Sequence, residues 1–106
     1  MQIVVELTTE ARQDLLRLIA ARTPDEGDAV RFAALYADDI EAQFRKYEAP
    51  PPGARRLVGA DGEEWWWRYA DGIWTVFTVA DRPGRLFRPA VRTFTVFAFQ
   101  ARPHVP

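Results

Sequence analysis

The stretch Trp65-Trp66-Trp67-Arg68-Tyr69-Ala70-Asp71-Gly72-Ile73-Trp74-Thr75-Val76-Phe77-Thr78-Val79 predicts two β-strands joined by a tight turn. Asp71 and Gly72 favour the positive φ angles of a two-residue type I′ turn, and aromatic and β-branched residues flank them on both sides. With these two residues as the loop, Ala70 pairs with Ile73. The register then continues outward through the pairs Tyr69–Trp74, Arg68–Thr75, Trp67–Val76 and Trp66–Phe77.

Both faces of this hairpin are largely apolar. One face is predicted to carry Trp65, Trp67, Tyr69, Trp74 and Val76, and the other to carry Trp66, Arg68, Ile73, Thr75, Phe77 and Val79. We expect one face to be covered and the other to be partly covered or used for binding. The alternation of residues leaves open which face is buried.

Length and composition predict a single domain over residues 1–106. The absence of Cys and Ser and the presence of only one His exclude a disulfide framework, a Ser-His-Asp or Cys-His triad, and a His-cluster metal site. No apolar run reaches the roughly 18 residues of a membrane span, and no secretory signal pattern is present. We therefore expect a cytoplasmic protein that uses neither a membrane nor a cofactor.

Charge is distributed unevenly along the chain. Residues 1–49 hold six basic and ten acidic side chains, whereas residues 50–106 hold eight basic and five acidic ones. No acidic residue follows Asp81. Such an asymmetry can give one positive surface on a protein whose net charge is only −1.

The N-terminal half predicts one strand and two helices. Residues 2–7 are short and β-branched, as in a strand, and Thr8 or Thr9 can cap a helix that ends near Arg22. Thr23 and Pro24 then favour a second helix start, with Glu26 completing a capping box. This second helix is expected to run from Pro24 to about Tyr47 and to form an antiparallel pair with the first.

The C-terminal half predicts strands. Three prolines at 50–52 form a connector, residues 55–58 lead into a strand, and residues 59–62 form a turn. A turn at 81–85 and a basic loop precede a last strand over residues 93–99, which is apolar on both sides. The order β-α-α-β-β-β predicts an α+β fold, with the helical hairpin packed on one face of a mostly antiparallel twisted sheet.

Arginines around this sheet are the candidate functional residues. They are Arg55, Arg56, Arg68, Arg82, Arg85, Arg88, Arg92 and Arg102, with His104 in the tail. Arginine binds phosphates and stabilises phosphoryl-transfer transition states, and aromatic rings stack on bases. The alternative interpretation is that these arginines only cover apolar surface and keep loops soluble. Phosphate-binding glycine loops, metal-binding His pairs and nucleophile elbows are all missing.

Three segments together carry a family resemblance: residues 5–15, residues 64–77 with their Arg68-x-Tyr69 strand, and the last strand and tail at 94–106. The chain resembles the RelE/ParE superfamily of small bacterial toxins, and most closely its HigB-like phage-associated branch. The resemblance implies an α+β toxin of a type II toxin–antitoxin pair. It also implies a cognate antitoxin as partner and a metal-independent, ribosome-dependent mRNA endonuclease activity.

Within that resemblance, Arg68, Arg102 and His104 correspond to catalytic residues of the family. The arginines Arg55, Arg56, Arg82, Arg85, Arg88 and Arg92 would contact RNA phosphates. Two positions depart from the family pattern, because Trp74 and Ala101 stand where arginine or another basic residue is usual. The alternative is a non-enzymatic member that binds gyrase or a phage or host protein. It would dock through the face that carries Trp65, Trp67, Tyr69 and Trp74. The third possibility is a degraded homologue that keeps the fold and has lost the activity.

Overall fold

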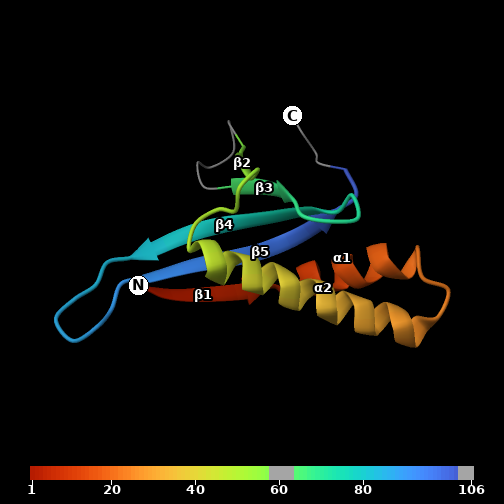
Figure 1. Cartoon of the computed structure of the whole chain (residues 1–106), viewed down its shortest axis with the longest axis horizontal. Helices are drawn as coiled ribbons and strands as arrows, with labels where there is room; N and C mark the ends of the chain where they lie inside the picture. Colours follow the sequence, from red (N-terminus) through yellow and green to blue (C-terminus); the bar gives the residue numbers. More distant parts are fainter. Residues whose placement is uncertain (58–63, 103–106) are drawn as a thin grey trace.

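The structure is a computed structural model that describes residues 1–57 and 64–102. Within these ranges, two helices and five strands follow one another in the order β-α-α-β-β-β-β. They are β1 (Gln2–Leu7), α1 (Thr9–Ala20), α2 (Glu26–Tyr47), β2 (Arg55–Arg56), β3 (Glu64–Arg68), β4 (Trp74–Arg82) and β5 (Val91–Gln100). The strands form one mixed sheet, and both helices cover the same face of it (Figure 1). The predicted α+β fold class is therefore confirmed.

The sheet has the strand order β1-β5-β4-β3-β2. β1 pairs with β5 in parallel, from Gln2 opposite Val91 to Leu7 opposite Val96, and every other pairing among these strands is antiparallel. β5 thus has a neighbour on each side, as its continuous apolar sequence leads one to expect.

The first helix starts as predicted. The Thr8 side chain accepts a hydrogen bond from the Ala11 amide at 3.1 Å, and the helix ends at Ala20, two residues before the predicted end. The prediction for the second helix start was wrong. α2 begins at Glu26, because the Asp25 carboxylate accepts a hydrogen bond from the Asp28 amide at 2.9 Å and so provides the N-cap instead of Thr23.

The core lies between α2 and the sheet and is dominated by aromatic side chains. Phe44 of α2 is fully buried, and its ring centroid lies 4.6 Å from that of Phe94, 4.8 Å from that of Phe77 and 5.8 Å from that of Trp67. These partners come from three neighbouring strands. Phe44 therefore packs against three neighbouring strands at the middle of the sheet.

The predicted turn of the aromatic hairpin is present, but the predicted register is wrong by one residue. Asp71 and Gly72 have φ angles of 56° and 71°, and the Ile73 amide donates to the Ala70 carbonyl at 3.0 Å. Beyond this turn, however, Arg68 lies opposite Trp74 rather than Thr75. Tyr69 is left outside the ladder as an extra residue.

This extra residue changes which side chains share a face. Trp65 and Trp67 now lie opposite Phe77 and Thr75 on the face under the helices, together with Ile73 and Val79 of the core. Trp66 and Arg68 lie opposite Val76 and Trp74 on the other face. The predicted faces were wrong, because each joined one set of alternate β3 residues to the set of β4 residues that points to the opposite side of the sheet.

Candidate functional site

The sheet face turned away from the helices combines arginine and tryptophan side chains. We call it the outer face and define it by Arg55, Trp66, Arg68, Trp74, Val76 and Gln100. Two transverse rows make it up, because residues opposite one another in antiparallel strands point to the same side. Arg68, Trp74 and Gln100 form one row. Arg55, Trp66 and Val76 form the other.

The two tryptophans of the outer face contact each other across β3 and β4. Their ring centroids are 6.5 Å apart at an interplanar angle of 62°, which is an edge-to-face arrangement. Nε1 of Trp66 and Oε1 of Gln100 are both buried and find no hydrogen-bond partner in the part of the chain that the structure describes. Buried polar atoms are normally paired. Thr75 Oγ1, on the helix side of the sheet, is a third such atom, so these atoms do not by themselves mark a ligand site.

Two of the three predicted catalytic residues lie toward the same end of the sheet. Arg68 is exposed at the end of β3, in the same row as Gln100, and the exposed Arg102 follows Gln100 by two residues. Arg55 lies on the same outer face, while its neighbour Arg56 is opposite Trp65 and hence on the other side. His104 and the predicted turn at 59–62 fall outside the described residues.

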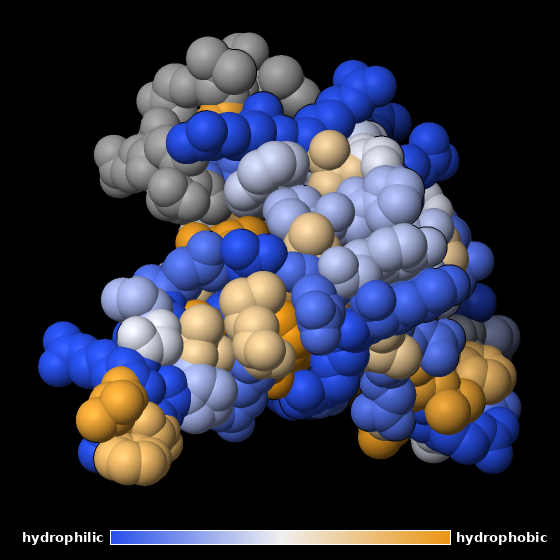
Figure 2. Space-filling model, turned by 60° about the vertical axis from the view of Figure 1, so that its left-hand side comes forward, coloured by the Kyte–Doolittle hydropathy of each residue, from blue (hydrophilic) through white to orange (hydrophobic). Residues whose placement is uncertain are grey.

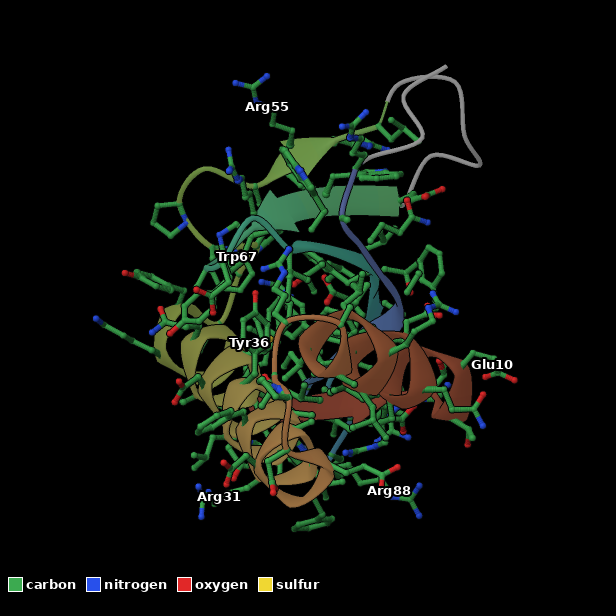
Figure 3. All side chains as sticks on the ribbon, turned by 90° about the vertical axis from the view of Figure 1, so that its right-hand side faces the viewer. Glu10, Arg31, Tyr36, Arg55, Trp67 and Arg88 are labelled. Atoms are coloured by element: carbon green, nitrogen blue, oxygen red, sulfur yellow. The ribbon has the colours of Figure 1, made fainter. Side chains whose placement is uncertain are left out.

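A second group of arginines lies at the opposite end of the sheet. The β4–β5 hairpin, whose tip we define as residues 82–88, carries the exposed Arg82, Arg85 and Arg88. The tip is separated from the row of Arg68 by the length of β4. The eight residue steps from Trp74 to Arg82 span about 26 Å. Arg55 and Arg88 also lie far apart in Figure 3. The arginines predicted to bind RNA therefore form two groups, too far apart to contact the same phosphate.

Arg92 belongs to neither group. Its guanidinium makes two hydrogen bonds to the Asp81 carboxylate, at 2.7 and 3.0 Å, and a third to the Glu48 carbonyl at 2.7 Å. The hydrogen bond from Arg92 lowers the pKa of Asp81, and the same contact raises the pKa of Arg92. Since all these contacts join β4, β5 and the end of α2, the geometry assigns Arg92 a structural role.

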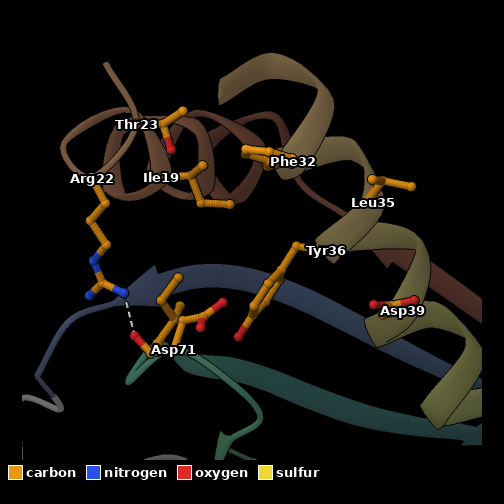
Figure 4. Close-up of a pocket in the computed structure, with 9 residues that line it drawn as sticks. Ile19, Arg22, Thr23, Phe32, Leu35, Tyr36, Asp39 and Asp71 are labelled. Atoms are coloured by element: carbon orange, nitrogen blue, oxygen red, sulfur yellow. Dashed lines mark hydrogen bonds between the residues drawn. The ribbon is translucent and has the colours of Figure 1, made fainter. Parts of the chain in front are cut away.

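A groove that sequence reasoning missed lies between the helices and the hairpin turn (Figure 4). We call it the helix–turn groove; its volume is about 380 Å³. It is lined by Ile19, Arg22, Thr23, Phe32, Leu35, Tyr36, Asp39, Asp71 and Ile73. Phe32 and Leu35 are apolar residues away from the buried stripe of α2, and both are exposed. This departure from helical amphipathicity was the available sequence signal.

Tyr36 closes the inner side of this groove beneath the hairpin turn. Its hydroxyl donates to the Ala70 carbonyl at 3.0 Å and accepts from the Ala70 amide at 3.3 Å. Figure 3 shows Tyr36 between the helices and the sheet. Burial raises the pKa of Tyr36 to about 12, although the Ala70 hydrogen bond acts in the opposite direction. At neutral pH the residue is therefore a neutral, structural hydroxyl.

The described residues contain neither a metal-binding cluster nor a membrane-spanning helix. No group of three or more His, Cys, Asp or Glu side chains there has an arrangement that could hold a metal ion. Neither α1 nor α2 is long and apolar enough to cross a membrane.

The comparisons with known proteins add no family name to this fold. No protein-family model matches the chain, and no curated protein matches it either. What is shown is an α+β protein in which two helices pack on a mixed sheet whose outer face carries arginines and tryptophans.

Proposed function

We propose that this chain is the toxin of a type II toxin–antitoxin pair and that it cleaves mRNA on the ribosome without a metal ion. The observation that carries the proposal is the position of Arg68 and Arg102 at one end of the outer face, with Trp74 and Gln100 in the same row. The order of helices and strands and the resemblance to RelE/ParE toxins support it. The unusual Trp74 supplies an aromatic surface where the family usually has arginine.

The proposed chemistry is attack by a ribose 2′-hydroxyl on the adjacent phosphorus. His104 accepts the proton of the 2′-hydroxyl, the bond from phosphorus to the 5′-oxygen breaks, and water protonates the leaving oxygen. Arg68 and Arg102 stabilise the extra negative charge on the phosphoryl oxygens. The products are a 2′,3′-cyclic phosphate and a 5′-hydroxyl end.

RNA recognition is assigned to the remaining outer-face residues. Trp74 offers a ring on which a base can stack, and Arg55 adds positive charge two strands away.

The test combines growth arrest with mapping of RNA ends. Expression of the wild type should arrest growth and produce cuts within translated mRNA. Arg68→Ala, Arg102→Ala and His104→Ala should each reduce cleavage by about 100-fold or more. Arg85→Ala with Arg88→Ala is the matched control, since it removes two exposed arginines at the far end of the sheet. Arrest without cuts would refute the nuclease assignment, and no arrest at verified expression would refute the toxin class.

A non-enzymatic, protein-binding member is the second candidate. The helix–turn groove favours it, because Phe32 and Leu35 are exposed apolar residues on a helix and such patches commonly bind proteins. Under this alternative, Leu35→Lys should abolish growth arrest while Arg68→Ala leaves it intact. The nuclease proposal predicts instead that Arg68→Ala abolishes growth arrest.

A further inference from the structure

The tip of the β4–β5 hairpin exposes two apolar side chains between arginines. Leu86 is 85% exposed and Phe87 is 97% exposed. They are the central residues of a tight turn in which the Arg85 amide donates to the Arg88 carbonyl at 2.9 Å and the Arg88 amide donates to the Arg85 carbonyl at 2.8 Å. Figure 2 shows the resulting hydrophobic protrusion, bordered by hydrophilic residues, at its lower left.

The backbone at this tip is unfavourable for the residue that occupies it. Phe87 has a φ angle of 67°, in the left-handed region where glycine or asparagine is preferred. The chain therefore holds a bulky apolar side chain in a disfavoured conformation and in contact with water. Exposed apolar residues grouped within a charged rim are typical of a contact surface.

The helix–turn groove has the complementary character. Its apolar walls include Ile19, Phe32 and Leu35 (Figure 4). Asp39 and Asp71 supply two negative charges and Arg22, which donates a hydrogen bond to the Asp71 carbonyl, one positive charge, so the groove is negative on balance. Neither carboxylate forms an ion pair within the described ranges 1–57 and 64–102. The volume of about 380 Å³ is in the range of pockets that hold small ligands, so a phenylalanine ring can enter.

A chain cannot place its tip in its own groove. β4 begins directly after Ile73, which lines the groove, and ends at Arg82, at the base of the tip. The strand keeps the two surfaces about 26 Å apart, and they lie at opposite ends of the longest axis of the molecule (Figure 1). The tip that fills the groove must therefore come from another molecule.

We propose that the hairpin tip of one copy of this chain docks into the helix–turn groove of a second copy. Leu86 and Phe87 enter between the apolar walls, and Arg85 and Arg88 approach Asp39 and Asp71 of the groove. A second copy is favoured over an anionic membrane or a nucleic acid because it accounts for both surfaces at once. A lipid or phosphate surface would bind the tip but would leave the groove without a ligand.

The geometry determines the type of assembly. Because tip and groove are different surfaces at opposite ends of the molecule, the contact is head-to-tail, and further copies can add in the same way. A hairpin tip in a groove buries less surface than the interfaces of stable dimers. The association should therefore be weak and concentration-dependent. Salt should weaken it further by screening the arginine–aspartate attraction.

Sedimentation analysis over a range of protein concentrations tests the proposal. The wild-type mass should rise from 12.1 kDa at low concentration to at least twice that value at high concentration. Phe87→Asp at the tip and Leu35→Lys in the groove should each weaken association by tenfold or more. Both sites are more than half exposed, so neither change should unfold the protein. Val30→Lys, at an exposed position of α2 outside the groove, is the matched control and should associate like the wild type.

Mixing the two defective variants gives the sharper result. Phe87→Asp retains an intact groove and Leu35→Lys retains an intact tip, so one contact can form between them. The mixture should form species of two chains and no larger ones, although each variant alone stays monomeric. A wild type that remains monomeric at every concentration would overturn the proposal, even if Phe87→Asp lost binding to anionic vesicles or to RNA. So would self-association that survives both substitutions, or a mixture that fails to associate.

Discussion

Tyr36 links the second helix to the turn of the aromatic hairpin through one oxygen atom. Its hydroxyl donates a hydrogen bond to the Ala70 carbonyl and accepts one from the Ala70 amide. Its ring packs edge-on against that of Tyr69, with the ring centroids 5.6 Å apart. Tyr69 is the residue that the β3–β4 ladder leaves out. The extra residue lets Trp65, Trp67 and Tyr69 share the helix side with Ile73 and the inward residues of β4. Burial of all these side chains explains why the shifted register is preferred.

Tyr36→Phe should lower the free energy of unfolding by about 1–3 kcal/mol, since two backbone groups of Ala70 lose a partner while the ring remains. Chemical denaturation at neutral pH measures the change. Tyr47→Phe is the matched control and should leave stability unchanged, because Tyr47 is 40% exposed. Equal stability of Tyr36→Phe and the wild type would show that the Ala70 contacts are not formed.

The same residue predicts a dependence on alkaline pH. The pKa of Tyr36 is about 12 in the folded protein and about 10 in the unfolded chain, so above pH 10 the unfolded chain loses its proton first. The stabilisation is complete below pH 10 and is lost as the pH rises through 12. The wild type should therefore lose roughly 1–3 kcal/mol more than Tyr36→Phe between these pH values. Parallel pH profiles of the two proteins would contradict this assignment.

At the scale of single elements, the start of α2 shows how two plausible caps compete. Thr23-Pro24 is a favourable helix start, yet Asp25 caps the helix, and its side chain accepts from the Asp28 amide. A carboxylate at this position satisfies a free amide and also interacts favourably with the positive end of the helix dipole. Both residues are good N-caps, so the sequence alone could not rank them.

Asp25→Ala should destabilise the protein by about 1 kcal/mol because the first turn of α2 loses its side-chain acceptor. Thr23→Ala is the matched control and should have little effect on stability, since Thr23 lies outside the helix. Thermal unfolding followed by circular dichroism distinguishes them. A larger loss for Thr23→Ala would mean that the predicted cap, and not the observed one, starts the helix.

The hairpin shows the limit of local sequence reasoning for strands. The Asp71-Gly72 turn was predicted correctly, because positive φ angles at both residues follow from their chemistry. The register was not, because it depends on Tyr36, which lies more than thirty residues earlier in the chain. A shift of one residue exchanges the faces of a strand, and so the predicted pair of Arg68 and Thr75 is replaced by a row of Arg68, Trp74 and Gln100.

At the scale of the whole molecule, one aromatic cluster holds the two layers together. Phe44 contacts the rings of Trp67, Phe77 and Phe94, which belong to β3, β4 and β5. The spacing of Tyr36, Ile40 and Phe44, four residues apart each, is that of one face of a helix. The sequence could not predict the three partners, because they depend on the order of the strands in the sheet.

Phe44→Ala should destabilise the protein by about 3–5 kcal/mol, since it leaves a cavity beneath three strands. Phe32→Ala, at a 44% exposed position of the same helix, is the matched control and should cost far less. Equilibrium unfolding in denaturant measures both variants. Comparable losses would contradict the arrangement of α2 on the sheet.

The separation of the arginines is also a property of the whole molecule. In the sequence, Arg82, Arg85 and Arg88 appear to extend the cluster that ends at Arg102. The length of β4 and β5 instead carries them to the far end of the sheet, while Arg92 is used in a contact with Asp81 and Glu48. The uneven distribution of charge along the sequence predicted one positive surface, whereas the length of the strands places these arginines in two separate groups.

The parallel pairing of β1 with β5 sets the order in which the protein can mature. Residues 2–7 leave the ribosome first, yet their partners at 91–96 are translated about ninety residues later. The nascent chain thus carries an unpaired strand through nearly all of its synthesis, and Gln100 can join the row of Trp74 and Arg68 only after β5 has been made. The outer-face row of Arg68, Trp74 and Gln100 is therefore complete only once the end of β5 has been translated.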